Sequence, residues 1–242
     1  MLTYREMVEM KKIQRSPSVQ VIIAALNEEE GIGLTIAELK EVLDDAEATF
    51  LVVDGNSVDA TAEKARSLGA EIVLQEGTGK GHAVAKAIEH IADTTDFVVI
   101  TDADFTYPAK YVPDMIRTLE KNPDIGMVCG NRFSGYLNLN LVNSLFYMGN
   151  RLIAFAHYLL NGIQLVDPLT GLRVLRAGIL RNWKVKSLGF DLEVELNTHV
   201  EQAGFEIAEI PIEYRERLGQ KKLGARHGVE ILRRIILETT YR

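Results

Sequence analysis

The chain has 242 residues, 47% of them hydrophobic, so it is long enough to bury a full core as one large domain. Its only cysteine, Cys129, excludes an internal disulfide framework and is expected in the core, inside a strand. A net charge of −7 disfavours general nucleic-acid binding. Residues 1–15 lack a signal-peptide pattern, and residues 133–150, the best transmembrane candidate, contain four asparagines.

Five short runs rich in valine and isoleucine predict strands that are buried on both faces. They cover residues 19–26, 50–53, 71–74, 97–100 and 125–129. Segments with helical spacing lie between them, at residues 31–43, 57–68, 81–91 and 108–121. Repeated βα units predict a doubly wound, Rossmann-like and mainly parallel α/β sheet, which binds ligands at the carboxyl ends of its strands.

The βα alternation ends near residue 130. Residues 138–160 predict a long helix interrupted by polar residues, and residues 204–214 a final strand that Pro211 places at a sheet edge. A helix between them carries an apolar stripe that includes His199, which we expect to be packed in the core. The last helix has an apolar side, formed by Val229, Leu232, Ile235 and Ile236.

Basic residues gather at the end of the chain. Residues 213–242 contain eight Lys or Arg and four Asp or Glu, a local charge of +4, which leaves −11 on residues 1–212. A basic amphipathic helix on an acidic body indicates contact with an anion or a membrane surface. The alternative is a helix that packs back on the sheet and leaves its charged face to solvent.

Asp102-Ala103-Asp104 is the most informative motif, because it follows the buried run at residues 97–100. Two carboxylates one residue apart at a strand end can converge on one Mg²⁺ or Mn²⁺ ion. These ions prefer oxygen ligands and often share them with substrate phosphates. The motif alone is weak evidence, since aspartate is also common in turns and helix caps.

Two glycine-rich segments are candidates for phosphate loops. Gly31-Ile32-Gly33 lacks the third glycine of a dinucleotide fingerprint and follows three glutamates. The segment GTGKG at 77–81 is not a P-loop, because Leu74 replaces its first glycine and Gly81 its hydroxyl residue. NAD and ATP chemistry are therefore poorly supported, although Lys80 and this loop can still contact an anion.

Taken together, the motifs resemble those of family-2 glycosyltransferases with the GT-A fold, in particular the dolichyl-phosphate mannose synthase-like branch. The resemblance runs from about residue 19 to residue 223. Its matching segments are AALNE at 24–28, VDGNSVDAT at 53–61, GKG at 79–81, DAD at 102–104, GNR at 130–132, DPLTGLR at 167–173, GFDLEVE at 189–195 and RLGQKKL at 217–223.

This resemblance implies a role for each matching residue. A nucleotide sugar would be bound by Ala24, Leu26, Asn27, Glu28, Val53, Asp54, Lys80, Asp102, Ala103, Asp104, Arg217 and Lys222. Asp54 would pair with the base, and Asp102 with Asp104 would hold Mg²⁺ or Mn²⁺ on the diphosphate, where the metal neutralises the leaving group. Arg132, Arg217 and Lys222 would contact acceptor or donor phosphates.

The catalytic residues implied are Asp191, Asp104 and Arg132. If the acceptor is a sugar hydroxyl, Asp191 is the candidate general base. A polyprenyl phosphate needs no strong base, because a phosphate monoester with a second pKa of about 6 is already anionic. The alternative for Asp191 is a cap on the helix that begins at residue 192, and Asp59 is expected to cap a helix as well.

We therefore predict an inverting, metal-dependent transfer of a hexose to a polyprenyl (dolichyl) phosphate or a lipid-linked sugar. The first candidate is mannose from GDP-mannose, and the second is glucose from UDP-glucose. A nucleotidyltransferase and a non-catalytic nucleotide-binding module are the alternatives from other classes.

The expected domain organisation has three parts. Residues 1–17 would be an extension, residues 18–223 the catalytic domain, and residues 224–242 the basic helix. The catalytic domain would have its nucleotide-sugar half at 18–130 and its acceptor half at 131–223. The protein is expected at the cytoplasmic face of a membrane, where the natural chain could continue into transmembrane helices.

Overall fold

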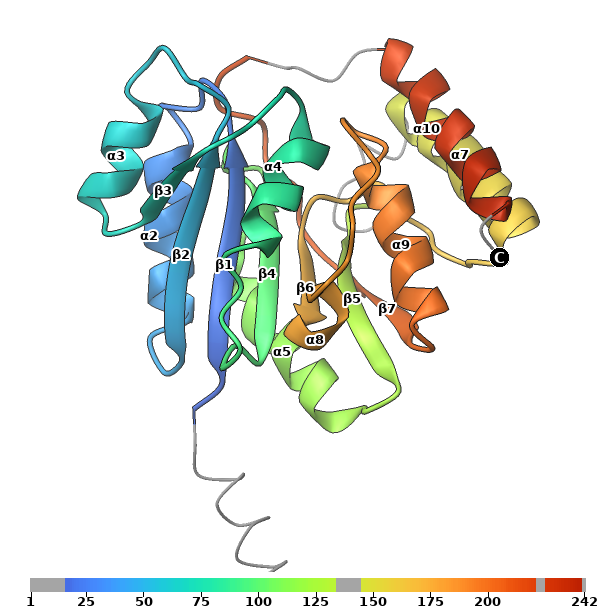
Figure 1. Cartoon of the computed structure of the whole chain (residues 1–242), viewed down its shortest axis with the longest axis horizontal. Coiled ribbons are helices and arrows are strands. Elements are labelled where there is room, and N and C mark those ends of the chain that lie inside the picture. Colours follow the sequence, from blue (N-terminus) through green and yellow to red (C-terminus); the bar gives the residue numbers. More distant parts are fainter. Residues whose placement is uncertain (1–15, 134–144, 221–224, 241–242) are drawn as a thin grey trace, which may run out of the picture.

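The computed structural model describes residues 16–133, 145–220 and 225–240. It is an α/β structure in which one seven-stranded sheet, in the order β3-β2-β1-β4-β6-β5-β7, has helices on both faces (Figure 1). The strands are β1 (Ser18–Ala25), β2 (Glu47–Asp54), β3 (Glu71–Leu74), β4 (Phe97–Asp102), β5 (Ile125–Asn131), β6 (Arg173–Arg176) and β7 (Glu206–Pro211). The helices are α2 (Ile32–Val42), α3 (Thr61–Ser67), α4 (Lys80–Ile88), the 3₁₀ turn η1 (Ala109–Tyr111), α5 (Val112–Lys121), α7 (Leu145–Asn161), α8 (Ala177–Leu180), α9 (Leu192–Gln202) and α10 (Ala225–Thr239).

All five strands predicted in the first half are present. Strands β3, β2, β1 and β4 pair in parallel, as the βα alternation requires. The prediction for β2 was too short, because the strand begins at Glu47 and its first three residues are exposed or half-buried. Those residues carry no apolar signal, whereas the five that follow are buried. Cys129 lies buried in β5 as predicted, and burial raises the pKa of its thiol to about 12.

The second half adds one strand that the sequence analysis missed. Strand β6 has four residues and runs antiparallel between β4 and β5. A strand this short shows no alternation that could separate it from a loop. The final strand β7 pairs only with β5 among the described strands and lies at the edge of the sheet, as Pro211 predicted.

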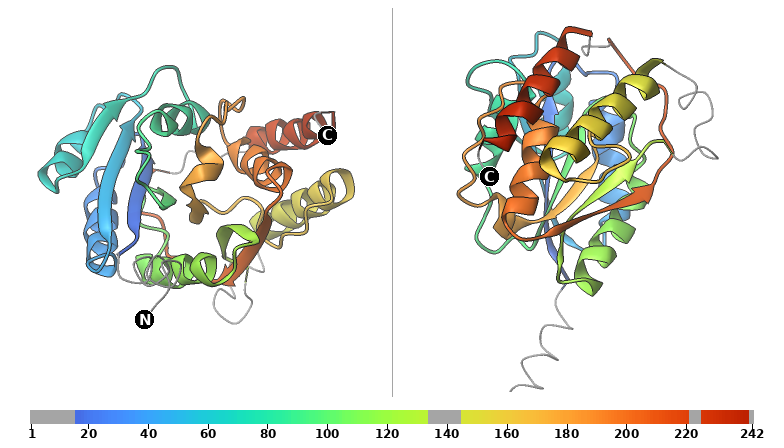
Figure 2. Two further views of the ribbon diagram at one scale, coloured as in Figure 1. Left: turned by 60° about the horizontal axis from the view of Figure 1, so that its bottom comes forward. Right: turned by 90° about the vertical axis from the view of Figure 1, so that its right-hand side faces the viewer.

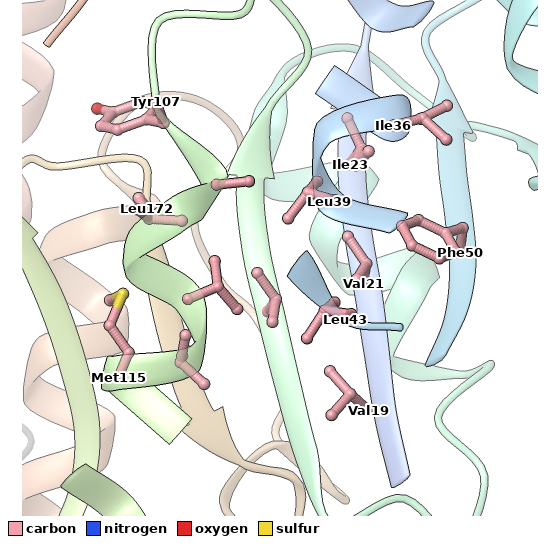
Figure 3. Close-up of a cluster of buried hydrophobic side chains, with 14 of the residues drawn as sticks. Val19, Val21, Ile23, Ile36, Leu39, Leu43, Phe50, Tyr107, Met115 and Leu172 are labelled. Carbon is pink, nitrogen blue, oxygen red and sulfur yellow. The ribbon is translucent and has the colours of Figure 1, made fainter. Parts of the chain in front are cut away.

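Each face of the sheet covers its own core. In β1, Val21 and Ile23 belong to the cluster under α2 and α5, while Ile22 between them belongs to the cluster under α4 and α9. The first cluster extends from Val19 near the start of β1 to Tyr107 after β4 (Figure 3). Complete burial of one such side chain contributes about 1.5–3 kcal/mol. These two cores hold the strand ends in place.

A third layer lies outside α9 and is formed by α7 and α10, which pack side by side (Figure 2, right). Ile153, Val194, Ile231 and Ile235 make its core. The predicted apolar side of the last helix is therefore wrong in detail, because Ile235 is buried while Val229 and Ile236 are 71% and 58% exposed. The predicted helix 138–160 corresponds to α7 from residue 145 onwards, and its first residues, 138–144, lie outside the described ranges. None of the helices in the described ranges has the length and apolar character to cross a membrane.

Candidate active site

Three parallel strands bring their carboxyl ends to one point on the edge of the sheet. Ala24 in β1 pairs with both Val53 in β2 and Asp102 in β4, and Ala25 pairs with Asp54. The predicted residues from three separate motifs are thus neighbours, because the carboxyl ends of parallel strands meet at the same edge. Leu26 and Asn27, which follow β1, are exposed, whereas Glu28 is buried.

Lys80, the first residue of α4, bridges two carboxylates in this site. Its Nζ lies 2.7 Å from Asp102 Oδ1 and 2.8 Å from Glu193 Oε1. Burial would lower the pKa of Lys80, but the negative charges of Asp102 and Glu193 outweigh it and raise that pKa. Burial would likewise raise the pKa of Asp102, but Lys80 lowers it, with smaller contributions from Arg132 and Arg217. Both groups are therefore charged at neutral pH.

The second aspartate of the motif, Asp104, is held by a different set of groups. Its Oδ1 accepts hydrogen bonds from the Thr106 backbone N–H at 3.1 Å and from Thr106 Oγ1 at 2.6 Å. Its Oδ2 lies 2.9 Å from Nη1 of Arg217, whose Nη2 pairs with Glu28. Burial and the charge of Asp102 raise the pKa of Asp104, whereas Thr106 and Arg217 oppose that rise.

Arg217 reaches this site because the segment after β7 runs along the aspartate motif. The Leu218 N–H donates to the Asp104 carbonyl at 3.2 Å, and the Arg215 N–H to the Thr106 carbonyl at 2.9 Å. Arg217 Nε is buried and donates to no acceptor among the described residues. A buried donor without an acceptor costs about 1–3 kcal/mol, so this nitrogen suits an anionic ligand.

Two glycines permit the chain to pass close to the aspartate motif. A Cβ on Gly171 would lie 2.4 Å from Asp102 Oδ2, and one on Gly31 would lie 2.6 Å from the Ala103 carbonyl oxygen. The Gly171 N–H also donates to Tyr107 Oη at 2.6 Å. Gly31 is not part of a dinucleotide fingerprint, but it allows the backbone to pack closely against Ala103. The sequence alone did not reveal this packing role.

Asp54 organises the loop beside the motif. Its two carboxylate oxygens accept hydrogen bonds from the Ser57 N–H at 3.0 Å and Ser57 Oγ at 2.5 Å. Asn27 accepts from the Val58 N–H and donates its own N–H to Ser57 Oγ, both at 2.9 Å. Asp59 accepts from the N–H of Thr61, the first residue of α3, at 3.0 Å, but the N-cap of α3 is Ala60 and no side chain caps the helix there, so the predicted cap is wrong.

Arg132 occupies a buried ion pair at the end of β5. Its Nε and Nη2 each donate to Asp167 at 2.7 Å, and its guanidinium faces the rings of Phe133, Phe146 and Tyr214. Burial would lower the pKa of Arg132, but Asp167 holds it far above the ordinary value. The predicted phosphate ligand is thus 4% exposed and bound to a carboxylate.

Asp191 lies at the start of α9 but does not cap it. No side-chain bond from Asp191 reaches the helix N–H groups, so the capping alternative is wrong. Instead Oδ1 accepts from the Gly189 N–H at 3.1 Å, and Oδ2 accepts from Arg234 Nε of α10 at 2.9 Å. His199 on the same helix stacks on Trp183 and contacts the Ile179 carbonyl oxygen at 2.7 Å, as expected for a packed histidine.

Sequence reasoning placed most of the candidate residues at this edge and missed several of their partners. The contacts of Glu193 with Lys80, of Thr106 with Asp104 and of Arg234 with Asp191 were not predicted, although Glu193 lies within the GFDLEVE segment. Lys222 lies outside the described residues. Its predicted phosphate contact stays a prediction.

A divalent cation fits the donor set at Asp102 and Asp104. Asp102 Oδ2 accepts no hydrogen bond from the described residues, and the side chain is 33% exposed. In the described ranges no group of three or more His, Cys, Asp or Glu side chains is arranged to hold a metal. Mg²⁺ is commonly held by one or two carboxylates together with substrate phosphates, so two aspartates suffice.

The class of GT-A glycosyltransferases is defined by a doubly wound sheet with an Asp-x-Asp motif at the end of a central strand. Here the basic side chains of Lys80 and Arg217 lie beside that motif. Crystal structures of glucosyl-3-phosphoglycerate synthase from Mycobacterium tuberculosis share this fold. One, a complex with Mn²⁺, UDP-glucose and phosphoglyceric acid, has a TM-score of 0.73 and 21% identity over 99% of this chain and 85% of that chain.

The family is shown by comparisons of the sequence. The model of glycosyl transferase family 2 matches residues 20–183. A dolichyl-phosphate hexose transferase of Haloferax volcanii is 36% identical, over 84% of this chain and 85% of its own length. The glycosyltransferase AglJ of the same organism is 32% identical over 83% of this chain but 64% of its own length. The protein thus belongs to glycosyl transferase family 2, and the hexosyltransferase class is supported.

Proposed function

We propose that the protein is a metal-dependent, inverting glycosyltransferase that moves a hexose from a nucleotide sugar to a polyprenyl phosphate. The observation that carries the proposal is the cluster of Asp102, Asp104, Lys80 and Arg217 at the carboxyl edge of the sheet. Two carboxylates suit a divalent cation, and the two cations beside them suit a diphosphate. When bound, the metal supplies positive charge to the departing nucleoside diphosphate.

The roles of the chain's own residues follow from their contacts. Asp102 and Asp104 would hold the metal, and Lys80 and Arg217 would turn from these carboxylates to the diphosphate oxygens. The unsatisfied Nε of Arg217 supports this exchange. Asp54 would bind the base from its position beside Ala24 and Val53, with Leu26, Asn27, Glu28 and Ala103 lining the donor pocket.

An acceptor that carries its own negative charge suits the surroundings of Asp191. Both oxygens of Asp191 are engaged, one by Arg234 and one by the Gly189 N–H. Its use as a general base would require the Arg234 pair to open. A phosphate acceptor needs no such base, since its oxygens are ionised at neutral pH with a second pKa of about 6. The name of the Haloferax dolichyl-phosphate hexose transferase supports the same acceptor class.

We place GDP-mannose first among donors, on the resemblance to the mannose synthase-like branch. UDP-glucose is the second candidate, favoured by the complexes in which the structural neighbours were crystallised. A nucleotidyltransferase is less suited, because residues 27–30 are acidic where that class carries a glycine-rich loop. Release of GDP or UDP from a panel of nucleotide sugars, with polyprenyl phosphate and with or without Mn²⁺, tests donor and metal. Release of neither nucleotide would overturn the proposal.

We also propose that the protein meets its lipid acceptor at the cytoplasmic face of a membrane, as a peripheral protein. Helix α7 supports this, because Met148, Leu152, Phe155 and Leu159 are each at least 60% exposed and recur every three or four residues. Arg151 is exposed beside them. This apolar face is more extensive than that of the basic tail, where only Val229 and Ile236 are large exposed hydrophobics among the described residues.

Sedimentation with anionic vesicles tests this proposal and separates the two helices. We expect Phe155→Glu to reduce vesicle binding strongly, because it places a charge in the apolar face. Ile236→Glu should reduce binding less. Equal vesicle binding by the wild-type protein and Phe155→Glu would exclude α7 as the membrane contact. If binding is lost only when residues 224–242 are removed, the basic tail is the membrane contact instead.

A further inference from the structure

The start of α9 carries three carboxylates that are held from opposite sides, Asp191 just before the helix and Glu193 and Glu195 in its first turn. Glu193 Oε1 contacts Lys80 Nζ at 2.8 Å, inside the candidate site. Asp191 Oδ2 accepts from Arg234 Nε of α10 at 2.9 Å, and Glu195 Oε2 lies 4.0 Å from Arg234 Nη1. The Arg234 side chain is only 10% exposed, so it faces the protein. Buried carboxylates are costly unless they are paired, which makes this arginine part of the support of α9.

Arg234 also pairs with Glu238 of its own helix at 3.6 Å, and the two carboxylates that it faces on α9 fix the backbone of the segment before that helix. Glu195 accepts hydrogen bonds from the N–H groups of Lys186 at 2.8 Å and Ser187 at 2.6 Å. Asp191 accepts from the Gly189 N–H at 3.1 Å. The position of residues 186–189 therefore depends on the Asp191 and Glu195 side chains, and Arg234 of α10 supplies the opposite charge to both.

This segment in turn presses against the glycine loop that carries Lys80. The Gly81 N–H donates to the Leu188 carbonyl at 3.2 Å. A Cβ on Gly79 would lie 2.3 Å from the Leu188 carbonyl oxygen, and one on Gly81 would lie 2.0 Å from that of Ser187. The two backbones are thus in direct contact on both sides of Lys80, so a shift of one requires a shift of the other.

We infer that Arg234 is a positioning residue for the donor site. It holds Asp191 and Glu195, these hold residues 186–189, and that segment sets the loop from which Lys80 reaches Asp102. The inference rests on the proposed function in one respect, namely that a nucleoside diphosphate binds beside Asp102 and Lys80. It also connects the outer helix layer, which α10 forms with α7 (Figure 2), to the binding of the donor.

Nucleotide affinity measured by calorimetry, with GDP and UDP in the presence of Mn²⁺, tests this role. We expect Arg234→Gln to weaken binding about tenfold, the scale of losses when a group that orients a ligand is removed. Arg234→Lys keeps the charge but not the forked geometry, so its loss should be intermediate. Ile231→Val, which loosens the packing of the same helix without touching an ion pair, serves as the matched control and should bind like wild type.

A double-mutant cycle with Asp191→Asn adds a sharper criterion. If Arg234 acts through Asp191, the double variant should bind nucleotide no more weakly than Arg234→Gln alone, whereas additive losses would overturn the inference. An equal loss in Ile231→Val would also overturn it, since general loosening of α10 would then explain the effect.

Hydrogen exchange tests the linkage without any nucleotide. Arg234→Gln should speed exchange of the amides at residues 79–81 and 186–189, and Ile231→Val should not. Unchanged exchange at residues 79–81 in Arg234→Gln would overturn the inference. Failure of the wild-type protein to bind either nucleotide, together with faster exchange in Arg234→Gln, would instead overturn the proposed function and leave the linkage supported.

Discussion

Lys80 Nζ lies 2.7 Å from Asp102 Oδ1, although the two residues are 22 positions apart. Helix α4 begins at Lys80 beside the end of β4, so the ammonium group neutralises a carboxylate that burial would otherwise disfavour. Glu193 holds the lysine from the other side. Arg217 likewise faces two carboxylates, Glu28 and Asp104, so acidic groups outnumber the two cations, which suits the addition of a divalent metal ion.

Asp104→Ala should abolish transfer while the fold is retained. Asp104 lies at a strand end rather than in an apolar cluster, and its proposed role is to hold the metal. Loss of one group that stabilises charge in a transition state costs about 10²–10³ in kcat. Steady-state transfer rates with circular dichroism as the folding check measure both effects. Asp114→Ala, an exposed aspartate on α5, is the control. Full activity of Asp104→Ala, or of the wild type in EDTA, would contradict the metal assignment.

Asp54→Ala should weaken nucleotide binding more than Mn²⁺ binding, since its carboxylate is proposed to pair with the base. Asp54 also anchors Ser57, so Ser57→Ala is needed as a control that releases the loop and keeps the carboxylate. Calorimetric titration of GDP and UDP gives the affinities. If Ser57→Ala loses as much affinity as Asp54→Ala, loop anchoring rather than base pairing is the role of Asp54.

Gly171→Ala should reduce activity by displacing Asp102, because the new Cβ would lie 2.4 Å from Asp102 Oδ2. The carboxylate must rotate away, which misplaces a proposed metal ligand. We expect a rise in the Mn²⁺ concentration needed for half-maximal activity. Gly149→Ala, where the structure has open space, should leave that concentration unchanged. An unchanged metal requirement in Gly171→Ala would show that Asp102 does not bind the metal.

Arg132→Met should destabilise the protein, because it leaves the Asp167 carboxylate buried without its cation. Removal of one partner of a buried ion pair costs about 3–5 kcal/mol. Urea denaturation measures the change in the free energy of unfolding. The double variant Arg132→Met/Asp167→Asn should recover part of the loss, since no buried charge remains. A loss below about 1 kcal/mol, the range of surface pairs, would point to a phosphate-binding role for Arg132 instead.

The Glu38–Arg215 pair should contribute a pH-dependent part of stability. A bidentate hydrogen bond from Arg215 lowers the pKa of Glu38 below its ordinary value. A lowered pKa means that the stabilisation is present above the unfolded-state pKa and is lost as the pH falls through the folded-state pKa. Thermal melts from pH 7 to pH 3 should therefore show a smaller acid-dependent fall in Tm for Glu38→Gln than for wild type. Parallel curves would exclude this contribution.

Much of the fold follows from short-range patterns. The edge strand β3 is only partly buried, whereas the strands β1, β2, β4 and β5 contain apolar runs that are buried, and such runs are visible within eight residues. The same holds for the motif at Asp102 and Asp104, since a strand end is a local feature. The alternation of strands and helices then places Asp54 and Asp102 at the same edge of the sheet, on either side of β1, because parallel strands align their carboxyl ends.

The pairing of charges did not follow from such patterns. Lys80 finds Glu193 across 113 positions of the chain, and Arg234 finds Asp191 across 43. From the sequence Arg234 belonged to a basic, membrane-facing helix, whereas in the structure it turns inward. Which charged residues pair depends on which helices pack together and on the free-energy cost of burying an unpaired charge. Both are decided only when the helices and the sheet have packed together. The short antiparallel β6 and the close approach at Gly171 arise in the same way, from contacts between segments far apart in the chain.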